Sequence, residues 1–155
     1  MFEGGAVSMT LDAKGRLAIP ARHREAVDFA LAQGPLVLTA RPDRCLILMP
    51  EAHWNPLREK IKQAPSFDPR AQSMKRVLIG NQRWISELDA SGRFLIDADL
   101  RGFAGLERNV YVVGMGESFE IWDDAAWKKQ NDLAQEAMQS MLGDNPVPGF
   151  EHISF

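Results

Sequence analysis

Apolar and polar residues alternate along the first eleven positions of the chain, where the apolar side chains include Val7, Met9 and Leu11. A polar segment at residues 12–15 separates this alternation from a short apolar run at residues 17–19. Alternation with a period of two is typical of a half-buried strand, and Asp and Gly are typical of turns. The pattern therefore predicts a strand, a tight turn and a second strand that ends at Pro20.

Helical and extended patterns follow in a fixed order. Residues 21–31 have helical composition, with one apolar face formed by Ala26, Phe29 and Ala30. Two apolar runs, at residues 36–39 and 46–49, then predict a hairpin. A further helix is predicted from Pro50, because proline is favoured near a helix start, and its apolar face contains Trp54, Leu57 and Ile61.

The same order of patterns returns in the second half of the chain. Residues 88–101 repeat residues 11–24 at a constant offset of 77, and the identities include the Asp, the Gly and both Arg of the segment. Residues 118–127 repeat residues 45–54 at an offset of 73, so the second copy has lost four residues between its helix and its hairpin. A tandem duplication explains these offsets better than shared composition. The second copy is predicted to contain strands 84–88 and 94–96, helix 100–106, and hairpin strands 110–113 and 118–122.

These patterns divide the chain into four segments. Residues 1–64 form the first repeat, residues 65–80 a linking loop and helix, and residues 81–143 the second repeat. Residues 144–155 are predicted to be an irregular tail, because they contain several Pro and Gly residues. Near the end of the second repeat a further apolar helix face is formed by Leu133, Ala134, Ala137, Met138, Met141 and Leu142. The expected fold class is mainly β with added helices.

The composition, with 45% hydrophobic and 25% charged residues among 155, is that of an ordinary soluble globular protein. No apolar run approaches the ~20 residues that cross a bilayer, and the N-terminus lacks the basic and apolar regions of a signal peptide. A cytoplasmic location is therefore the default expectation. The single cysteine, Cys45, cannot form an internal disulfide, and its place beside an apolar run predicts a packing role in a strand.

The charge is unevenly divided between the two halves. The net charge is −3, but residues 1–80 carry +4 and residues 81–155 carry −7. The first motif has four cations, and no acid separates the first from the last: Lys14, Arg16, Arg22 and Arg24. A polyanion would be attracted to the first half and repelled by the second.

Five features in a fixed order show a family resemblance: an N-terminal Met-Phe-x-Gly, a first motif Gly-Arg-x-x-Ile-Pro-x-x-x-Arg, Pro50 four residues before Trp54, the segment 77–80, and a second Asp-x-x-Gly-Arg. The sequence resembles the MraZ family of bacterial transcriptional regulators, relatives of the AbrB-type DNA-binding proteins. The resemblance covers nearly the whole chain. It implies a swapped-hairpin, double-psi-related β-barrel with flanking helices, in which the two halves of one chain intertwine as the two chains of an AbrB-type dimer do.

The resemblance also implies a function. It predicts a ring-shaped homo-oligomer that binds double-stranded promoter DNA at short direct repeats, usually in the promoter of its own division and cell-wall gene cluster, and that acts as a repressor in the nucleoid. No membrane, cofactor, metal or small-molecule substrate is expected. The expected DNA contacts are Lys14, Arg16, Arg22 and Arg24, because basic side chains at a turn and a helix start bind phosphates, and Arg also reads guanine.

The remaining motif residues are expected to be structural. Asp12 precedes Arg16 by four residues across the turn, so its carboxylate is expected to accept backbone N–H groups or to orient the arginine. A structural role in the turn is likewise expected for Gly15 and, in the second copy, for Asp89, Gly92 and Arg93. The second copy has Asp97 and Asp99 in place of Pro20 and Arg22, which disfavours phosphate. An alternative stays open: if the Asp–Arg pair only locks the turn in both copies, Arg16 is structural as well.

Other classes of protein are less well supported. An aspartic protease has Ser or Thr directly after its catalytic Asp, whereas Ala13 and Ala90 follow here, and the three histidines lack metal-ligand spacing. A second basic cluster, formed by Arg70, Lys75 and Arg76, is interpreted as the solvated face of a helix. The competing function is an antitoxin-like interaction module whose acidic second half neutralises a basic partner protein. An enzyme is not expected.

Overall fold

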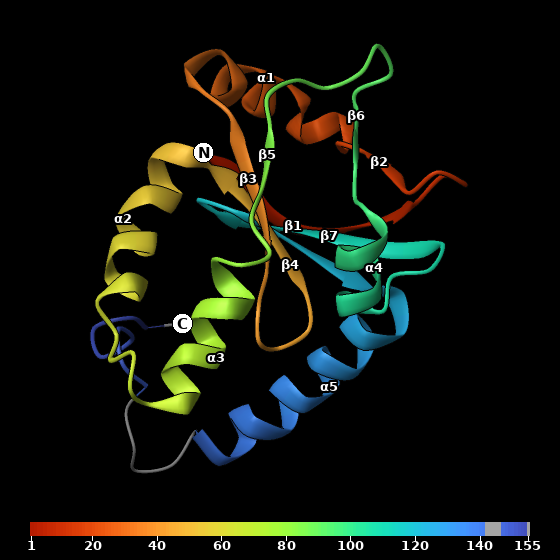
Figure 1. Cartoon of the computed structure of the whole chain (residues 1–155). Coiled ribbons are helices and arrows are strands. Elements are labelled where there is room, and N and C mark those ends of the chain that lie inside the picture. The colour runs from red at the N-terminus through yellow and green to blue at the C-terminus, as the bar shows by residue number, and fades with distance from the viewer. Residues whose placement is uncertain (142–146, 155) are drawn as a thin grey trace. The chain divides into compact units, whose positions relative to one another are not determined.

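The computed structural model describes residues 1–141 and 147–154, and the order of its elements confirms the order predicted for both copies (Figure 1). The first copy contains β1 (Phe2–Thr10), β2 (Arg16–Ala18), a 3₁₀ turn η1 (Ala21–His23), α1 (Arg24–Gln33), β3 (Leu36–Ala40), β4 (Leu46–Pro50) and α2 (Glu51–Lys62). After α3 (Pro69–Leu78), the second copy contains β5 (Arg83–Ile85), β6 (Arg93–Leu95), α4 (Ala98–Ala104), β7 (Asn109–Gly116), β8 (Phe119–Asp123) and α5 (Asp124–Met141). The chain divides into two compact units, Met1–Asp124 and Ala125–Phe155.

Within the described residues the strands form a six-stranded main sheet, in the order β1-β7-β8-β4-β3-β5, and a separate β2–β6 ribbon. Every pairing is antiparallel. β1 and β2 do not pair with each other: β1 pairs with β7, and β2 pairs with β6. Strands of one copy are thus paired with strands of the other, which confirms the mainly antiparallel, swapped-hairpin fold class. The described strands form two separate sheets and not the closed barrel that the resemblance implied.

Two matching hydrogen bonds extend the ribbon where each strand meets the other copy's turn. The amide of Ile19 donates to the carbonyl of Gly92 at 3.0 Å, and the amide of Ile96 donates to the carbonyl of Gly15 at 2.9 Å. Ile19 and Ile96 occupy the same position in the repeat, as do Gly15 and Gly92. The two motif turns are therefore held next to each other by a pseudo-twofold relation.

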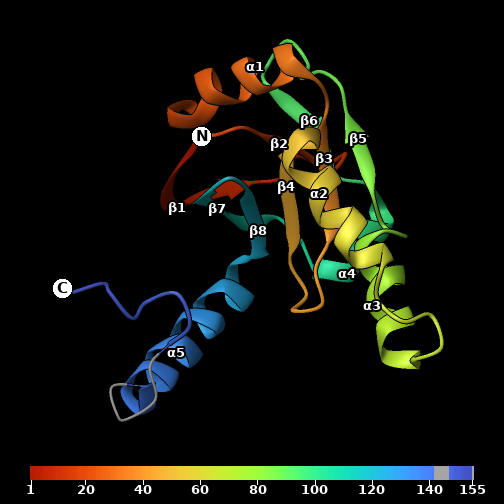
Figure 2. The ribbon, with the colours of Figure 1, turned by 90° about the vertical axis from the view of Figure 1, so that its left-hand side faces the viewer.

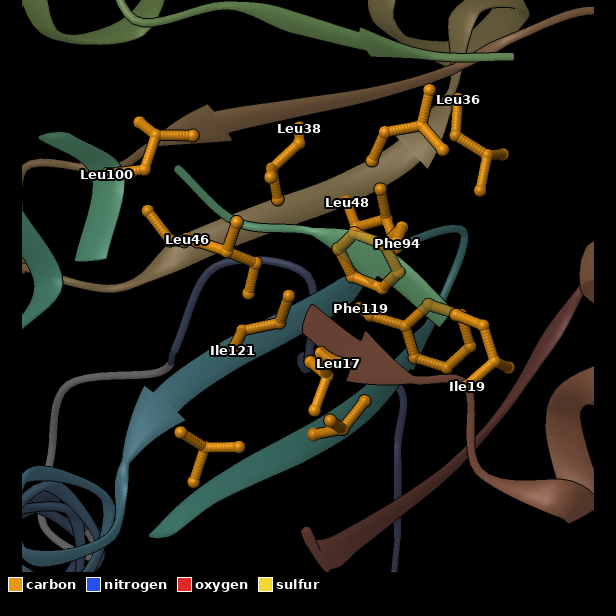
Figure 3. Packing of buried hydrophobic residues seen from close by; sticks show 14 of the residues in the cluster. Leu17, Ile19, Leu36, Leu38, Leu46, Leu48, Phe94, Leu100, Phe119 and Ile121 are labelled. Atoms are coloured by element: carbon orange, nitrogen blue, oxygen red, sulfur yellow. The ribbon is translucent and has the colours of Figure 1, made fainter. Parts of the chain in front are cut away.

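The principal core joins the ribbon to the main sheet. Leu17 and Phe94, which face each other in the ribbon, belong to the same buried cluster as side chains of the sheet (Figure 3). The sheet residues that the cluster contains include Leu36, Leu38, Leu46, Leu48, Phe119 and Ile121. Alternate residues of a strand point to one face, so β3 and β4 each direct two leucines into this core. Each fully buried side chain of this kind stabilises the fold by about 1.5–3 kcal/mol.

The opposite face of β3 and β4 is covered by α2 and α3, which lie on the same side of these strands (Figures 1 and 2). A second buried cluster forms there from Val37, Met49 and Trp54. The hydroxyl of Thr39 donates to the carbonyl of Leu78 at 2.6 Å, and the indole of Trp54 donates to Gln82 Oε1 at 2.9 Å. α3 begins where Asp68 accepts the amide of Arg70, at 2.8 Å, as an N-cap.

Two apolar side chains that were predicted to lie on the apolar faces of helices are exposed. Phe29 is 69% exposed, because the buried face of α1 is centred on Val27 instead. Leu57 on α2 is 44% exposed, whereas Trp54 is buried as predicted. The predicted faces were wider than the buried ones, because Val27 is the buried residue of α1 and Trp54 that of α2.

The loss of four residues in the second copy falls between the start of its helix and its hairpin. At the offset of 77, α4 aligns with residues 21–27, so its first three residues correspond to η1 and it ends six residues earlier than α1. The connection to the hairpin is two residues longer, which leaves the net loss of four. β5 is shorter than predicted and ends at Ile85, because the following residues lead into the second motif turn. The alignment at an offset of 73 places β8 on β4 and the start of α5 on the start of α2, as the sequence indicates.

Cys45 is fully buried beside β4, which confirms its packing role. Burial raises the pKa of its thiol, which disfavours the thiolate that would react or bind metal.

In the second unit, Leu133 and Met138 of α5 are exposed. The Met141 side chain and Leu142, which belong to the same predicted face, lie outside the described residues, as do residues 144–146 and 155 of the predicted tail. Among the tail residues that are described, turns form where Phe150 donates to Val147 and Ile153 donates to Phe150.

Candidate nucleic-acid interface

The first motif turn is built by the carboxylate of Asp12. Its Oδ1 accepts the amides of Lys14 and Arg16, both at 2.9 Å, and its Oδ2 accepts the Nε–H of Arg16 at 2.7 Å. Gly15 has a φ of +86°, a conformation that glycine adopts without strain. The spacing Asp-x-x-Gly-Arg is therefore what this turn requires.

The second motif forms the same turn. Asp89 Oδ1 accepts the amides of Ser91 and Arg93, both at 2.9 Å, and Asp89 Oδ2 accepts the Nε–H of Arg93 at 3.0 Å. Gly92 has a φ of +74°. The two turns thus have matching geometry, although they differ in sequence at Lys14 and Ser91.

The two turns also contact each other through their charges. Arg93 Nη1 lies 3.2 Å from Asp12 Oδ2, and Arg16 Nη1 lies 3.9 Å from Asp89 Oδ2. We call these four residues the motif cluster: Asp12, Arg16, Asp89 and Arg93. Its side chains are between 28% and 34% exposed, and its formal charges cancel. The cluster is therefore a neutral scaffold, from which each arginine still presents part of its guanidinium to solvent.

The last arginine of each motif lies over the glycine of the other motif's turn. A Cβ atom at Gly15 would overlap the guanidinium of Arg101, and a Cβ atom at Gly92 would overlap that of Arg24. Arg101 also donates to the carbonyl of Ile96, and Arg24 Nε donates to Asp28 at 3.2 Å. This arrangement explains why both copies contain these glycines and arginines. Sequence reasoning missed it, although the shared Arg24 and Arg101 were the signal.

The other two predicted DNA contacts lie outside the motif cluster. Lys14 is exposed at the tip of the first turn. Arg22, whose side chain is 49% exposed, donates through Nη2 to the carbonyl of Gly4 at 3.2 Å and lies 4.0 Å from Glu3. The structure thus brings Arg16 to the junction of the two turns, and it places Lys14 and Arg22 as exposed cations of the first copy.

In the second copy Asp97, which stands in place of Pro20, makes internal contacts. Asp97 accepts the amides of Asp99 and Leu100 as the N-cap of α4, and it pairs with Arg83 Nε at 2.7 Å. Arg83 was not predicted as a site residue. A groove of about 520 Å³ lies here, and its lining includes Arg16, Trp84 and Arg93. Trp84, which is 58% exposed, is a further residue of this surface that sequence reasoning missed.

The two aspartates predict how stability depends on pH. The amide of Arg16 and the other hydrogen bonds to Asp12 lower its pKa from 3.8 to about 2, and the amide of Arg93 and its neighbours lower the pKa of Asp89 in the same way. The charged form is favoured in the folded state, so these groups stabilise the fold above about pH 4, and that contribution is lost as the pH falls toward 2. Unfolding in urea at successive pH values should show this loss.

The variants Asp12→Asn and Asp89→Asn should each be less stable at neutral pH and should lose less stability on acidification than the unmodified protein. The exposed residue Glu107 provides the control variant Glu107→Gln, whose acid profile should match that of the unmodified protein. Parallel acid profiles for all four proteins would contradict a role of these carboxylates in the folded turns.

In the described ranges, 1–141 and 147–154, no group of three or more His, Cys, Asp or Glu side chains is placed to hold a metal ion. No helix formed by these residues is both long enough and apolar enough to span a bilayer.

Comparisons with known proteins agree with the motifs. The model of the family described as "MraZ protein, putative antitoxin-like" matches residues 1–77 and 85–142. A protein named Transcriptional regulator MraZ from Dechloromonas aromatica is 58% identical over 150 residues, which cover 97% of each chain. A protein of the same name from Aromatoleum aromaticum is 48% identical, with 99% of each chain covered. Another from Azoarcus is 50% identical, with 96% of this chain and 95% of the relative covered. The chain belongs to the MraZ family.

Proposed function

We propose that this protein is a DNA-binding transcriptional regulator that contacts double-stranded promoter DNA with its first motif. One observation carries this proposal. The two motif turns have matching geometry, but the first has Lys14 where the second has Ser91, and Arg22 where the second has Asp99. The first copy thus carries two exposed cations, Lys14 and Arg22, that the same scaffold lacks in the second copy. The names of the relatives support a regulator rather than an enzyme.

The proposed DNA contacts are Lys14, Arg16, Arg22 and Arg24. Lys14 and Arg22 are exposed and bind phosphates by charge-assisted hydrogen bonds. Asp12 holds the Nε–H of Arg16 at 2.7 Å and so fixes the direction of its guanidinium. A guanidinium that is already oriented loses less freedom when it reads O6 and N7 of a guanine in the major groove. Asp12 is therefore proposed to position Arg16 rather than to contact DNA.

A single subunit with about four basic contacts binds DNA weakly at physiological salt. We propose that the subunits assemble into a ring-shaped homo-oligomer, because linked subunits on spaced repeats gain effective concentration without new contacts. The proposed target is a set of short direct repeats in the promoter of the protein's own division and cell-wall gene cluster, and the proposed effect is repression. Such a protein acts in the cytoplasm, at the nucleoid. We further propose that the repeats 1–64 and 81–143 act as one intertwined body.

The number of DNA repeats provides the test. Affinity should be measured on fragments of equal length that carry one, two, three or four repeats, with scrambled sequence in place of the missing ones. We expect each added repeat to tighten binding by about tenfold or more, up to the number that the oligomer spans. Equal affinity for one and four repeats would contradict the proposed mode of binding.

The description of the family as antitoxin-like favours one second candidate, an interaction module that neutralises a partner protein through the acidic residues 81–155. This candidate predicts that a basic protein co-purifies in a fixed stoichiometry from the native host. A protein that purifies without such a partner and binds the repeat-bearing fragments would exclude it.

A further inference from the structure

His23 lies between two proposed DNA contacts, Arg22 and Arg24, at the junction of η1 and α1. Its amide donates to the carbonyl of Pro20 at 2.8 Å, and its side chain is only 1% exposed. The side chains of Arg22 and Arg24 are 49% and 40% exposed, whereas that of the histidine is buried. The residue therefore attaches the arginine-bearing turn to the sheet beneath it.

The surroundings of this imidazole are aromatic and apolar. The ring of Phe119 and the imidazole meet edge to face, with 4.8 Å between their centroids. The ring of Phe2 in turn stacks on that of Phe119, with 4.2 Å between their centroids. Gly114 of β7 lies beside the imidazole, since a Cβ atom there would be in van der Waals contact with His23 Cε1 at 3.5 Å. Within the described residues, neither Nδ1 nor Nε2 of His23 has a hydrogen-bond partner. The side chain is thus packed as an aromatic ring.

The charged groups that act on His23 are Arg22, next to it in the chain, and Glu3 on β1, while β7 and β8 contact it through Gly114 and Phe119. Burial, followed by the charge of Arg22, lowers the pKa of His23, and Glu3 opposes this effect. A protonated ring would bury a charge and two N–H donors without acceptors, which is unfavourable in an apolar site. The packed position therefore favours the neutral imidazole.

We propose that His23 is a positioning residue for DNA binding: its neutral ring, seated on Phe119, holds the turn that carries Arg22 and Arg24, and protonation releases that turn and weakens binding. This inference rests on the proposed function. The sign of the effect is unusual. Acidification makes a protein more positive and generally strengthens its binding to DNA, whereas here it should weaken binding.

The test uses the double variant His53→Gln, His152→Gln as the parent, because His23 is then the single histidine of the chain. Affinity for the four-repeat fragment is measured at constant ionic strength between about pH 7.5 and about pH 5.5. Because the pKa of His23 is lowered, the loss of affinity should set in below the ordinary histidine value of about 6.5, and it should not exceed about tenfold per pH unit. Adding His23→Phe, which keeps an aromatic ring and cannot be protonated, should leave affinity within about threefold at neutral pH and remove this loss.

Two further measurements keep the test decisive if the phenylalanine variant does not fold. The imidazole proton signals of the parent should show that protonation of His23 coincides with the loss of DNA binding. The variant His23→Lys should bind at least about tenfold more weakly at neutral pH although it adds a positive charge.

Superimposable pH profiles of the parent and the phenylalanine variant would contradict the inference, as would protonation of His23 without loss of affinity. If the parent binds the fragment tightly at neutral pH and either of these results is found, the inference about His23 is contradicted and the proposed function is not. A parent that does not bind the fragment at neutral pH would contradict the proposed function, and the inference with it.

Discussion

Replacing Arg16 with alanine is expected to weaken binding to repeat-bearing DNA by about a hundredfold or more, whereas Arg93→Ala should change it by less than about threefold. A well-placed arginine contact to a base contributes about 1–3 kcal/mol, and the loss is repeated in every subunit that contacts the DNA. Arg93 occupies the same turn geometry, but Asp99 and Ser91 replace the flanking cations of its copy.

The matching geometry makes Arg93→Ala a suitable control for Arg16→Ala. Each variant removes one Nε–carboxylate contact, of 2.7 Å for Arg16 and 3.0 Å for Arg93. Each also removes one Nη1 contact with the aspartate of the other turn, of 3.9 Å for Arg16 and 3.2 Å for Arg93, and leaves the other arginine near both aspartates. Because the side chains are about one-third exposed, each loss should reduce stability by only about 1 kcal/mol. Affinity is measured on the four-repeat fragment, and stability by unfolding in urea. Equal losses of affinity in two folded variants would contradict the assignment of DNA contact to the first copy.

The substitution Gly114→Ala is expected to destabilise the fold by about 3 kcal/mol. Gly114 pairs with Gly5 across β7 and β1, and a register shift in β1 brings the carbonyl of Glu3 onto it. A Cβ atom at Gly114 would overlap that carbonyl oxygen, and a backbone atom has no rotamer by which to move aside. The start of β1 would have to move, together with Phe2, which is buried on Phe119.

Gly102 provides the matched control. It lies within α4, and a Cβ atom there would meet no atom within 4 Å. Gly102→Ala should therefore stabilise the fold by about 0.5–1 kcal/mol, because alanine is the better helix former. Urea unfolding of both variants gives the comparison. Equal stability of the two proteins would show that β1 does not pack on β7 as described.

The elements of this fold follow closely from the sequence, but their partners do not. The alternation before Asp12 and the run at Leu17 identify β1 and β2, and the offset of 73 places β8 on β4. Alternation indicates that a segment is extended and says nothing about which strand it pairs with. A strand, a turn and a strand in sequence usually suggest a local hairpin. Here the swapped pairing was expected only from the family resemblance.

The local contacts of the site can likewise be predicted from the sequence, whereas the contacts between distant segments cannot. The contacts of Asp12 with Lys14 and Arg16 span two and four residues, so the motif spacing predicts them. The contact between Arg93 and Asp12 spans 81 residues, and it arises only because the swapped strands bring the two turns together. In the sequence His23 is one of three scattered histidines, and residue type alone does not indicate which of them is buried.

The most direct measurement is selection of DNA by the purified protein from a pool of genomic fragments, followed by sequencing of the bound fraction, with Arg16→Ala as the matched control. We expect the bound fragments to share short direct repeats at a regular spacing, and we expect Arg16→Ala to abolish their enrichment. A bound fraction with no common sequence would contradict the proposal that this protein reads DNA.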